Sequence, residues 1–414
     1  MSTPTPTPTP EPEQAGGTPT ARATLAGRLD GFLRVGGIVT PILTTLLAFV
    51  VGGLVVLVTG HNPLSTYKAI FDGTGLQWFV PGTGDRELSA TNLQQTLILT
   101  TPLILVGLAV AFAFRAGLFN IGGQGQYSVG AILAVWLGSS LGGLPGWLHI
   151  VVAILAGMAG GAAWAAIAGL LRATVGANEV ISTIMLNYVA LWVGVFLFGL
   201  GGPLQNSTDP SLPTSNDILA NAHLPVFWGD PVLQGLHIGL FVALAAGIVF
   251  WVVLNRTAKG FEARAVGFNP DAAQYAGINV GRTYVTVMAI CGAFAGLAGA
   301  LDVLGWQFRL ATNDISSSQI GFLGIAVALL GRNTAIGTTF AALLFGALLQ
   351  GTSVRNLDPA VFDPNLASNL TTIIQGLVVL VVSADVLVTY FYRLGRRRKR
   401  EPGAGSAASA EVTA

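Results

Sequence analysis

The sequence predicts an all-α polytopic membrane protein with about ten transmembrane helices. Hydrophobic residues make up 52% of the 414 residues and charged residues only 9%, whereas a soluble domain usually carries about 25% charged residues. The mean hydropathy is +0.67. Apolar runs recur along the chain, and basic residues gather in alternate connections between them. These observations indicate that the bilayer is the solvent of the chain.

A membrane helix needs roughly 20 mostly apolar residues. Ten candidate segments meet or approach this length: 38–59, 95–114, 118–138, 148–171, 180–200, 235–254, 283–303, 318–331, 335–351 and 369–392. The eighth is short and the ninth begins directly after it. The pair 318–351 therefore forms either two tilted spans or a partly re-entrant pair.

The distribution of Lys and Arg predicts the orientation. When the N-terminus lies inside and ten spans alternate, 16 of the 20 basic residues fall on the inner side. The basic residues on the outer side are then Lys68, Arg86, Arg309 and Arg355. The positive-inside rule therefore predicts that both termini are cytoplasmic.

Composition divides the chain into three parts. Residues 1–34 form a Pro/Thr-rich tail that we expect to be disordered and cytoplasmic, without the pattern of a signal peptide. Residues 35–395 form the transmembrane domain, with external loops at 60–94 and 201–234 and a cytoplasmic loop at 255–282. Residues 396–414 form a basic and then disordered cytoplasmic tail.

The sequence lacks the residues that several classes of function require. There is no G-x-x-x-x-G-K-[ST] motif, so we expect no ATP site in this chain. One cysteine (Cys291) and scattered histidines predict no metal site, and a net charge of +1 predicts no nucleic-acid binding. The sequence has no paired carboxylates and no serine–histidine arrangement that would indicate an enzyme. Asp302, Asp385 and Glu179 lie near predicted span ends rather than inside spans, which argues against a proton-driven carrier.

The cytoplasmic loop contains a short helical pattern. Asn269 is placed to cap a helix with Pro270 at its first position, and Gly277 is placed to end it. The stretch is too short and too polar to span a membrane. It is either a docking helix along the membrane face or an ordinary interfacial loop.

Residues 117–126, GLFNIGGQGQ, place glycines and amides between two apolar runs. Asn120, Gln124 and Gln126 offer hydrogen bonds without the cost of burying a charge. They either line a path for a neutral solute or tie helices together. The further candidates for such a path are Asn178, Asn187 and Trp306. Trp306 suits either stacking on a ring or an aromatic belt at the interface.

Four stretches resemble one family in order along residues 35–395. They are EARAVGFNPDAAQYAGI (262–278), FRAGLFNIGGQGQ (114–126), GANEVISTIMLNYVAL (176–191) and GFLGIAVALLGRNTAIGT (321–338). The first resembles the EAA-like cytoplasmic loop of permease subunits of ATP-binding-cassette (ABC) importers. The branch is the one that handles simple sugars, nucleosides and branched-chain amino acids, and the nucleoside subgroup is most similar.

The resemblance implies a type II importer bundle in a bacterial plasma membrane. It implies two permeases of the same or related sequence, cytoplasmic ATPases that carry ATP and Mg, and an external solute-binding protein or lipoprotein, with no cofactor in this chain. The residues that match the coupling motif, and for which it implies contact with the ATPase, are Glu262, Gly267, Asn269, Ala273 and Gly277.

The implied substrate is a nucleoside or simple sugar, with branched-chain amino acids third. The alternative is a stand-alone secondary transporter or channel for a small neutral polar solute, which leaves the 262–278 loop unexplained.

Overall fold

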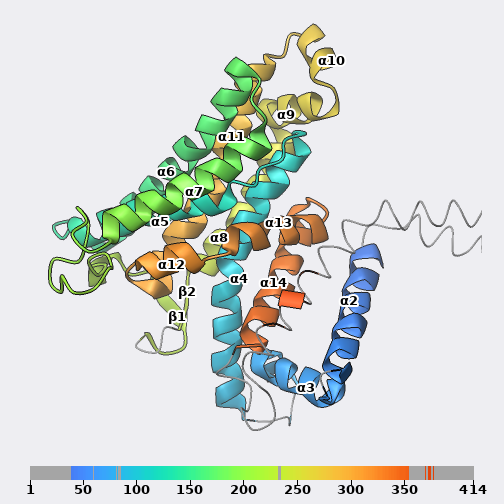
Figure 1. The fold of residues 1–414 in the computed structure, drawn as a ribbon, viewed down its shortest axis with the longest axis vertical. Helices are drawn as coiled ribbons and strands as arrows, with labels where there is room; N and C mark the ends of the chain where they lie inside the picture. Colours follow the sequence, from blue (N-terminus) through green and yellow to red (C-terminus); the bar gives the residue numbers. More distant parts are fainter. Residues whose placement is uncertain are drawn as a thin grey trace, which may run out of the picture.

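The computed structural model describes residues 39–58, 60–80, 82, 85–231, 235–353 and the single positions 369, 372, 373 and 376. The predicted tails 1–34 and 396–414 and nearly all of the predicted segment 369–392 lie outside these residues. The described part is a helical bundle (Figure 1).

The elements follow one another in this order: α2 (Val39–Val58), α3 (Pro63–Thr74), η1 (Leu76–Phe79), α4 (Arg86–Arg115), α5 (Gly123–Ser140), α6 (Gly146–Val175), α7 (Glu179–Phe198), η2 (Ala220–Ala222), β1 (Val226–Trp228), β2 (Leu236–His237), α8 (Gly239–Arg256), α9 (Ala258–Phe268), α10 (Pro270–Tyr275), α11 (Val280–Asp302), the π-helical turn η4 (Val303–Gln307), α12 (Thr312–Ser317), α13 (Ile320–Leu330) and α14 (Ala335–Gly351).

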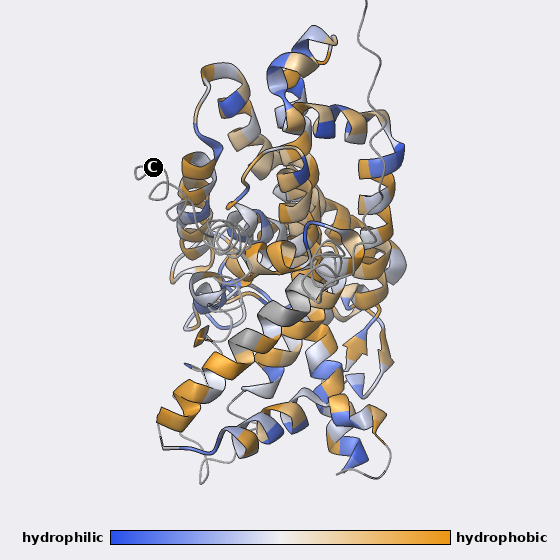
Figure 2. Cartoon of the chain, turned by 90° about the vertical axis from the view of Figure 1, so that its right-hand side faces the viewer, coloured by the Kyte–Doolittle hydropathy of each residue, from blue (hydrophilic) through white to orange (hydrophobic). Residues whose placement is uncertain are grey.

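Within the described residues, six helical stretches are long and apolar enough to cross a membrane: Arg86–Arg115, Gly146–Val175, Glu179–Phe198, Gly239–Arg256, Val280–Gln307 and Thr312–Leu330. Hydrophilic residues are most frequent at the α9–α10 end and at the opposite end (Figure 2). The chain is therefore a multi-pass membrane protein with an all-α bundle, as the composition predicts.

Helix α4 is the central helix, and it packs against α8, α11, α13 and α14. Its apolar middle from Leu103 to Ala113 is buried throughout. It begins at Arg86 rather than at residue 95 because Asp85 caps it by accepting the Glu87 N–H. The connection 60–94, whose external position stays a prediction, contains α3, η1 and the first turns of α4.

Small residues set the packing of α5, α6 and α11. A Cβ on Gly292 of α11 would lie 2.1 Å from the Gly161 carbonyl oxygen of α6. A Cβ on Gly161 would lie 2.2 Å from the Gly292 oxygen in return. The two backbones thus touch directly, which is the contact that only small residues permit in a membrane.

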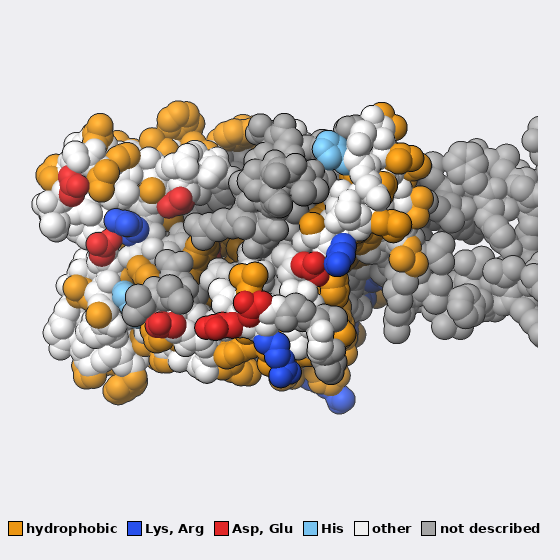
Figure 3. Space-filling view, turned by 90° about the horizontal axis from the view of Figure 1, so that it is seen from below, with side chains coloured by type: hydrophobic (Ala, Val, Ile, Leu, Met, Phe, Trp, Pro, Cys, Tyr) orange, Lys and Arg blue, Asp and Glu red, His pale blue; other side chains and the backbone are white. Residues whose placement is uncertain are grey.

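The segment 201–238 lies over the turn η4. The Ile218 and Leu224 N–H groups donate to the Phe308 and Leu304 carbonyls at 2.8 and 2.9 Å. Strands β1 and β2 pair antiparallel at the end of this segment. Figure 3 shows the face opposite α9 and α10, where acidic side chains lie across the middle. Residues 201–231 of the predicted external loop 201–234 therefore include a cover that is hydrogen-bonded to this turn.

The pair 318–351 consists of two helices of unequal length. Helix α13 has 11 residues and α14 has 17. At a rise of 1.5 Å per residue, α13 is about 16 Å long, roughly half the hydrocarbon thickness. It begins inside the bundle beside α5, where Gly321 N–H donates to Gln124 Oε1 at 2.8 Å.

Candidate functional site

Helices α9 and α10 form a hydrophilic helical pair at one end of the bundle (Figure 1). Asn269 caps α10 by accepting the Ala272 N–H at 3.0 Å, and Pro270 is the first helical residue. Gly277 follows the helix with φ +84°. The predicted short helix with these three signals is confirmed. The predicted loop 255–282 contains a second helix, α9, over residues 258–268.

The residues of the coupling motif have different environments. Glu262 pairs with Lys259 at 2.7 Å on the surface of α9, and Ala273 is buried on α10. Two aromatic side chains that the sequence reasoning missed, Phe268 and Tyr275, are 89% and 94% exposed. The signal was available, since Phe268 directly precedes the Asn269–Pro270 cap and Tyr275 is the last residue of the short helix. Exposed aromatic residues of this kind mark interaction surfaces.

Gly267 joins α9 to the end of α4. A Cβ on Gly267 would lie 2.7 Å from the Arg115 carbonyl oxygen, and a Cβ on Gly117 would lie 2.9 Å from the Gly267 Cα. Gly117 also has φ +70°, a conformation that L side chains rarely adopt. The backbone of α9 therefore lies in direct contact with the C-terminal end of the central helix and with the residues that follow it.

The GLFNIGGQGQ stretch is a break between two helices. Residues 116–122 have no helix, and α5 starts at Gly123 beside Val106 of α4. Val106 precedes Arg115 by nine residues, which corresponds to about 13 Å along the helix. Helix α5 therefore begins inside the bundle, at the depth at which α13 begins. Discontinuous helices of this kind commonly form substrate sites in transporters.

The amides of the break satisfy its backbone and one another. Asn120 and Gln126 pair through two hydrogen bonds of 3.0 Å, and Asn120 also accepts the Gly122 N–H. Asn187 of α7 accepts from Gly125 N–H and donates to the Ile121 carbonyl. The contacts of these three amides tie segments together, so packing is the interpretation that the structure supports for them.

Gln124 and Asn178 differ from that group. Gln124 Oε1 accepts from Gly321, but its Nε2 is buried without a partner. Asn178 caps α7 by accepting the Val180 N–H at 2.9 Å. It is followed by Glu179, which pairs with Arg172 at 2.7 Å. Asn178 is therefore explained as a helix cap.

Asp302 is buried at the junction of α11 and η4. It is 3% exposed and lies within the apolar stretch Val280–Gln307. Asp302 lies near the end of this stretch, as predicted, and η4 continues the helix five residues beyond it. Its carboxylate accepts from Tyr127 Oη, Trp306 Nε1 and, at 2.8 Å, Gln307 Nε2. Trp306 thus holds a buried carboxylate instead of standing in an aromatic belt.

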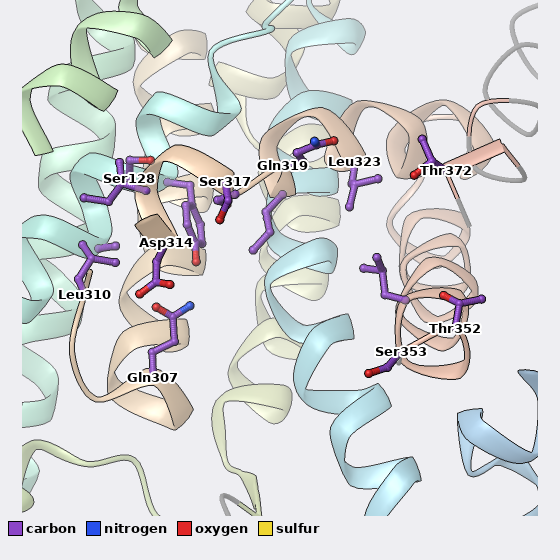
Figure 4. Close-up of a pocket in the computed structure, with 16 residues that line it drawn as sticks. Ser128, Gln307, Leu310, Asp314, Ser317, Gln319, Leu323, Thr352, Ser353 and Thr372 are labelled. Carbon is purple, nitrogen blue, oxygen red and sulfur yellow. The ribbon is translucent and has the colours of Figure 1, made fainter. Parts of the chain in front are cut away.

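A cavity of about 600 Å³ lies beside this carboxylate cluster, bounded by α5, η4, α12, α13 and α14 (Figure 4). Its polar lining includes Tyr127, Ser128, Gln307, Asp314, Ser317 and Ser318. None of the six residues proposed from sequence for a substrate path lines it. Trp306 reaches it indirectly, through Asp302 and Gln307. The missed signal is the spacing of Asp302, Trp306 and Gln307, which brings their side chains together on one helical turn.

The described residues contain no group of three His, Cys, Asp or Glu side chains able to hold a metal ion. Three histidines bind protein groups instead. His149 lies within hydrogen-bonding distance of Asn221 and the Leu137 carbonyl, and His223 stacks on Phe308. His237 accepts the Gly239 N–H, and burial lowers its pKa to about 4, so its ring is neutral at neutral pH.

Comparison with known proteins agrees with this arrangement. Residues 92–383 match the family model for the permease component of branched-chain amino acid transport systems. The guanosine ABC transporter permease protein NupP of Bacillus subtilis is 36% identical over 89% of this chain and 98% of its own length. The nucleoside permease NupB of Lactococcus lactis is 34% identical over 85% and 92%. The glucose permease TsgB13 of Haloferax volcanii is 36% identical over 82% and 86%. No solved structure matches.

The bundle, with the hydrophilic helical pair α9 and α10 and a helix break inside it, is thus the membrane-spanning subunit of an ABC importer. The chain belongs to the family of branched-chain amino acid transport system permease components. It is a transport subunit, and a permease of this kind implies a separate ATPase and a substrate-binding protein. The resemblance inferred from the four sequence stretches is confirmed, and the stand-alone carrier is not supported.

Proposed function

We propose that this chain forms the path by which a nucleoside crosses a bacterial plasma membrane, with a simple sugar as the second candidate. The observation that carries the proposal is the similarity along nearly the whole chain to permeases named for guanosine and nucleosides. The glucose permease relative, at 36% identity, supports the second candidate. Two of these relatives are bacterial, in Bacillus and Lactococcus.

We also propose that the chain crosses the membrane ten times, with both termini in the cytoplasm. The charge distribution supports it, since the α9–α10 end carries Lys259, Arg264 and Arg282. This end then faces the cytoplasm, where the ATPase and its ATP and Mg are located. The acidic side chains of the opposite face then meet the external solute-binding protein (Figure 3).

Coupling begins at α9 and α10. Phe268 and Tyr275 project from this end and offer the ATPase two exposed aromatic anchors. Glu262, Asn269, Ala273 and Gly277 give the helix pair its shape, and Gly267 connects it to α4. Closure of the ATPase dimer moves α9, and α4 carries that motion to the break at 116–122. The ATPase must bind the two conformations with different free energy for this to occur.

Affinity purification tests the proposal. The C-terminus is tagged, native membranes are extracted in mild detergent, and co-purifying proteins are identified by mass spectrometry. We expect a stoichiometric P-loop ATPase, together with a second permease if the pair is heteromeric. An eluate without an ATPase, from a preparation that still transports after reconstitution, would contradict the importer mechanism.

A further inference from the structure

The cavity beside Asp302 has polar atoms without protein partners. Gln307 Oε1 and Ser318 Oγ are both buried, and neither has a hydrogen-bond partner in the protein. Both residues line the cavity. A buried polar atom without a partner loses about 1–3 kcal/mol of hydration, so native structures rarely keep one without a reason. A bound solute that pairs with these atoms supplies that reason.

Asp302 fixes which end of the Gln307 amide faces the cavity. Gln307 Nε2 donates to Asp302 Oδ2 at 2.8 Å. The amide is planar, with its donor and acceptor on opposite sides, so Oε1 is turned away from Asp302 as an acceptor. Because Tyr127 and Trp306 also donate to Asp302, the carboxylate cannot rotate freely and the orientation of Gln307 is held.

Asp314 adds a second acceptor opposite Gln307. Its Oδ2 accepts the Ala311 N–H at 3.0 Å, and an ionised carboxylate has about four lone-pair sites. Figure 4 shows the polar ends of Asp314 and Gln307 turned toward each other at the cavity wall. Asp314 is exposed and open to solvent, whereas Gln307 Oε1 is buried without a partner. A ligand that brings one donor to each would fit this pair of acceptors.

We propose that this cavity binds the transported solute through two neighbouring hydroxyl groups, which donate to Gln307 and Asp314 while Ser318 contacts the same solute. This inference rests on the proposed function. Guanosine and glucose, for which two of the relatives are named, are both uncharged and differ in ring type and aromaticity, but both carry vicinal hydroxyls. A volume of about 600 Å³ lies within the usual range of small-molecule sites.

Ser316 of α12 and Ser318, which directly follows this helix, offer a matched pair of variants. Ser318 Oγ has no protein partner and lines the cavity, so Ser318→Ala removes no internal hydrogen bond. Ser316 is exposed, its Oγ donates to the Asn313 carbonyl, and it is not part of the cavity wall. Ser316→Ala is therefore the control. Asp314→Asn keeps an oxygen for the Ala311 N–H and replaces the other acceptor by a donor.

The experiment is ATP-dependent uptake into proteoliposomes that contain the complete complex and its binding protein. Guanosine and 2′,3′-dideoxyguanosine are the probes, and glucose is measured in parallel. Because every variant uses the same binding protein, a change in KM between variants belongs to this chain. We expect Ser318→Ala and Asp314→Asn to raise the KM for guanosine about tenfold, the effect of one lost ligand hydrogen bond. Ser316→Ala stays within about twofold of wild type, as expected for a residue away from the site.

The dideoxy probe separates a diol site from a merely structural effect. For 2′,3′-dideoxyguanosine, we expect Asp314→Asn to leave KM at the wild-type value. Equal effects of a variant on both probes, or wild-type KM values for guanosine in both variants, would overturn the inference while the proposed function stands. Uptake that depends on sodium and not on the hydroxyls would overturn it as well, in favour of a cation site. No ATP-dependent uptake of guanosine or glucose by wild type would overturn the proposed function and the inference together.

Discussion

Helix α11 and the segment that follows its C-terminal end are built differently. Along α11, glycines of α11 and α6 bring backbone against backbone. After Asp302, the chain forms a π-helical turn, the six-residue helix α12 and the 11-residue helix α13. Unpartnered polar atoms are found there, at Gln307 and Ser318. The comparison teaches that the α6–α11 contact fixes the shape of the bundle and that the segment after α11 leaves space and hydrogen-bonding capacity for a solute.

The largest expected effect is a loss of stability at the contact between α6 and α11. Gly292→Ala places a Cβ 2.1 Å from the Gly161 oxygen, a backbone atom that is unable to swing away. We expect a loss of about 3 kcal/mol, at the upper end of overpacking effects. Thermal unfolding of the detergent-solubilised complex measures it. Gly247→Ala is the control, since its nearest neighbour is Leu108 Cδ1 at 4.0 Å. Equal melting temperatures for the two variants would show that the α6–α11 contact does not fix the bundle.

The second prediction concerns the junction between α9 and α4. Gly117→Ala brings a Cβ within 2.9 Å of Gly267 Cα and strains a residue with φ +70°. Gly176→Ala carries the same backbone strain at φ +66° but meets nothing within 4 Å. Both variants lose about 1–2 kcal/mol of stability. We expect only Gly117→Ala to lower the solute moved per ATP, by about tenfold, which a shift of 1.4 kcal/mol between conformations produces. Parallel losses of coupling in both would rule out transmission through this contact.

Removal of an exposed aromatic anchor is expected to weaken assembly. Phe268→Ser should reduce ATPase affinity by about 30-fold, the effect of losing roughly 2 kcal/mol at an interface anchor. Titration of labelled ATPase onto the permease in nanodiscs measures it. Phe227→Ser on β1, at the opposite end, is the control for loss of an exposed phenylalanine. Unchanged ATPase binding in Phe268→Ser would place the docking surface elsewhere.

The smallest effect is expected at Asn178. Because its side chain caps α7, Asn178→Ala should cost about 1 kcal/mol of stability and Asn178→Ser should restore most of it. The KM of transport should not change in either variant. A raised KM in the Ser variant, with normal stability, would return Asn178 to the substrate path.

Local sequence signals predicted much of the fold. The apolar runs located the long helices, and Asn269, Pro270 and Gly277 located α10 because capping depends on neighbouring residues alone. The start of α4 and the whole of α9 were missed because apolar runs were used to locate helices. Charged residues in their first turns lower the hydropathy but do not break the helix. The Asp85 cap was readable in the sequence but was assigned to a loop.

The site was less accessible to sequence reasoning. The amides of 117–126 are notable in sequence, yet their partners include Asn187, which is 62 residues from Gly125, and Gly321, 197 residues from Gln124. Contacts at that separation depend on tertiary packing. The role of Asp302 was hidden because the π-helical turn extends α11 by five residues. Gln307 and Ser318 are identified only by what they lack, a hydrogen-bond partner in three dimensions.

The most direct test of the account is uptake of radiolabelled guanosine by proteoliposomes that hold the permease, its co-purified ATPase and the binding protein. The account predicts accumulation of guanosine in the lumen against its gradient when the binding protein is outside and ATP and Mg are enclosed in the lumen, on the ATPase side of the membrane. It predicts no accumulation when a non-hydrolysable analogue replaces ATP. Uptake at the same rate without ATP hydrolysis, by a preparation in which the ATPase is bound and active, would contradict the claim that this chain couples solute movement to a partner ATPase.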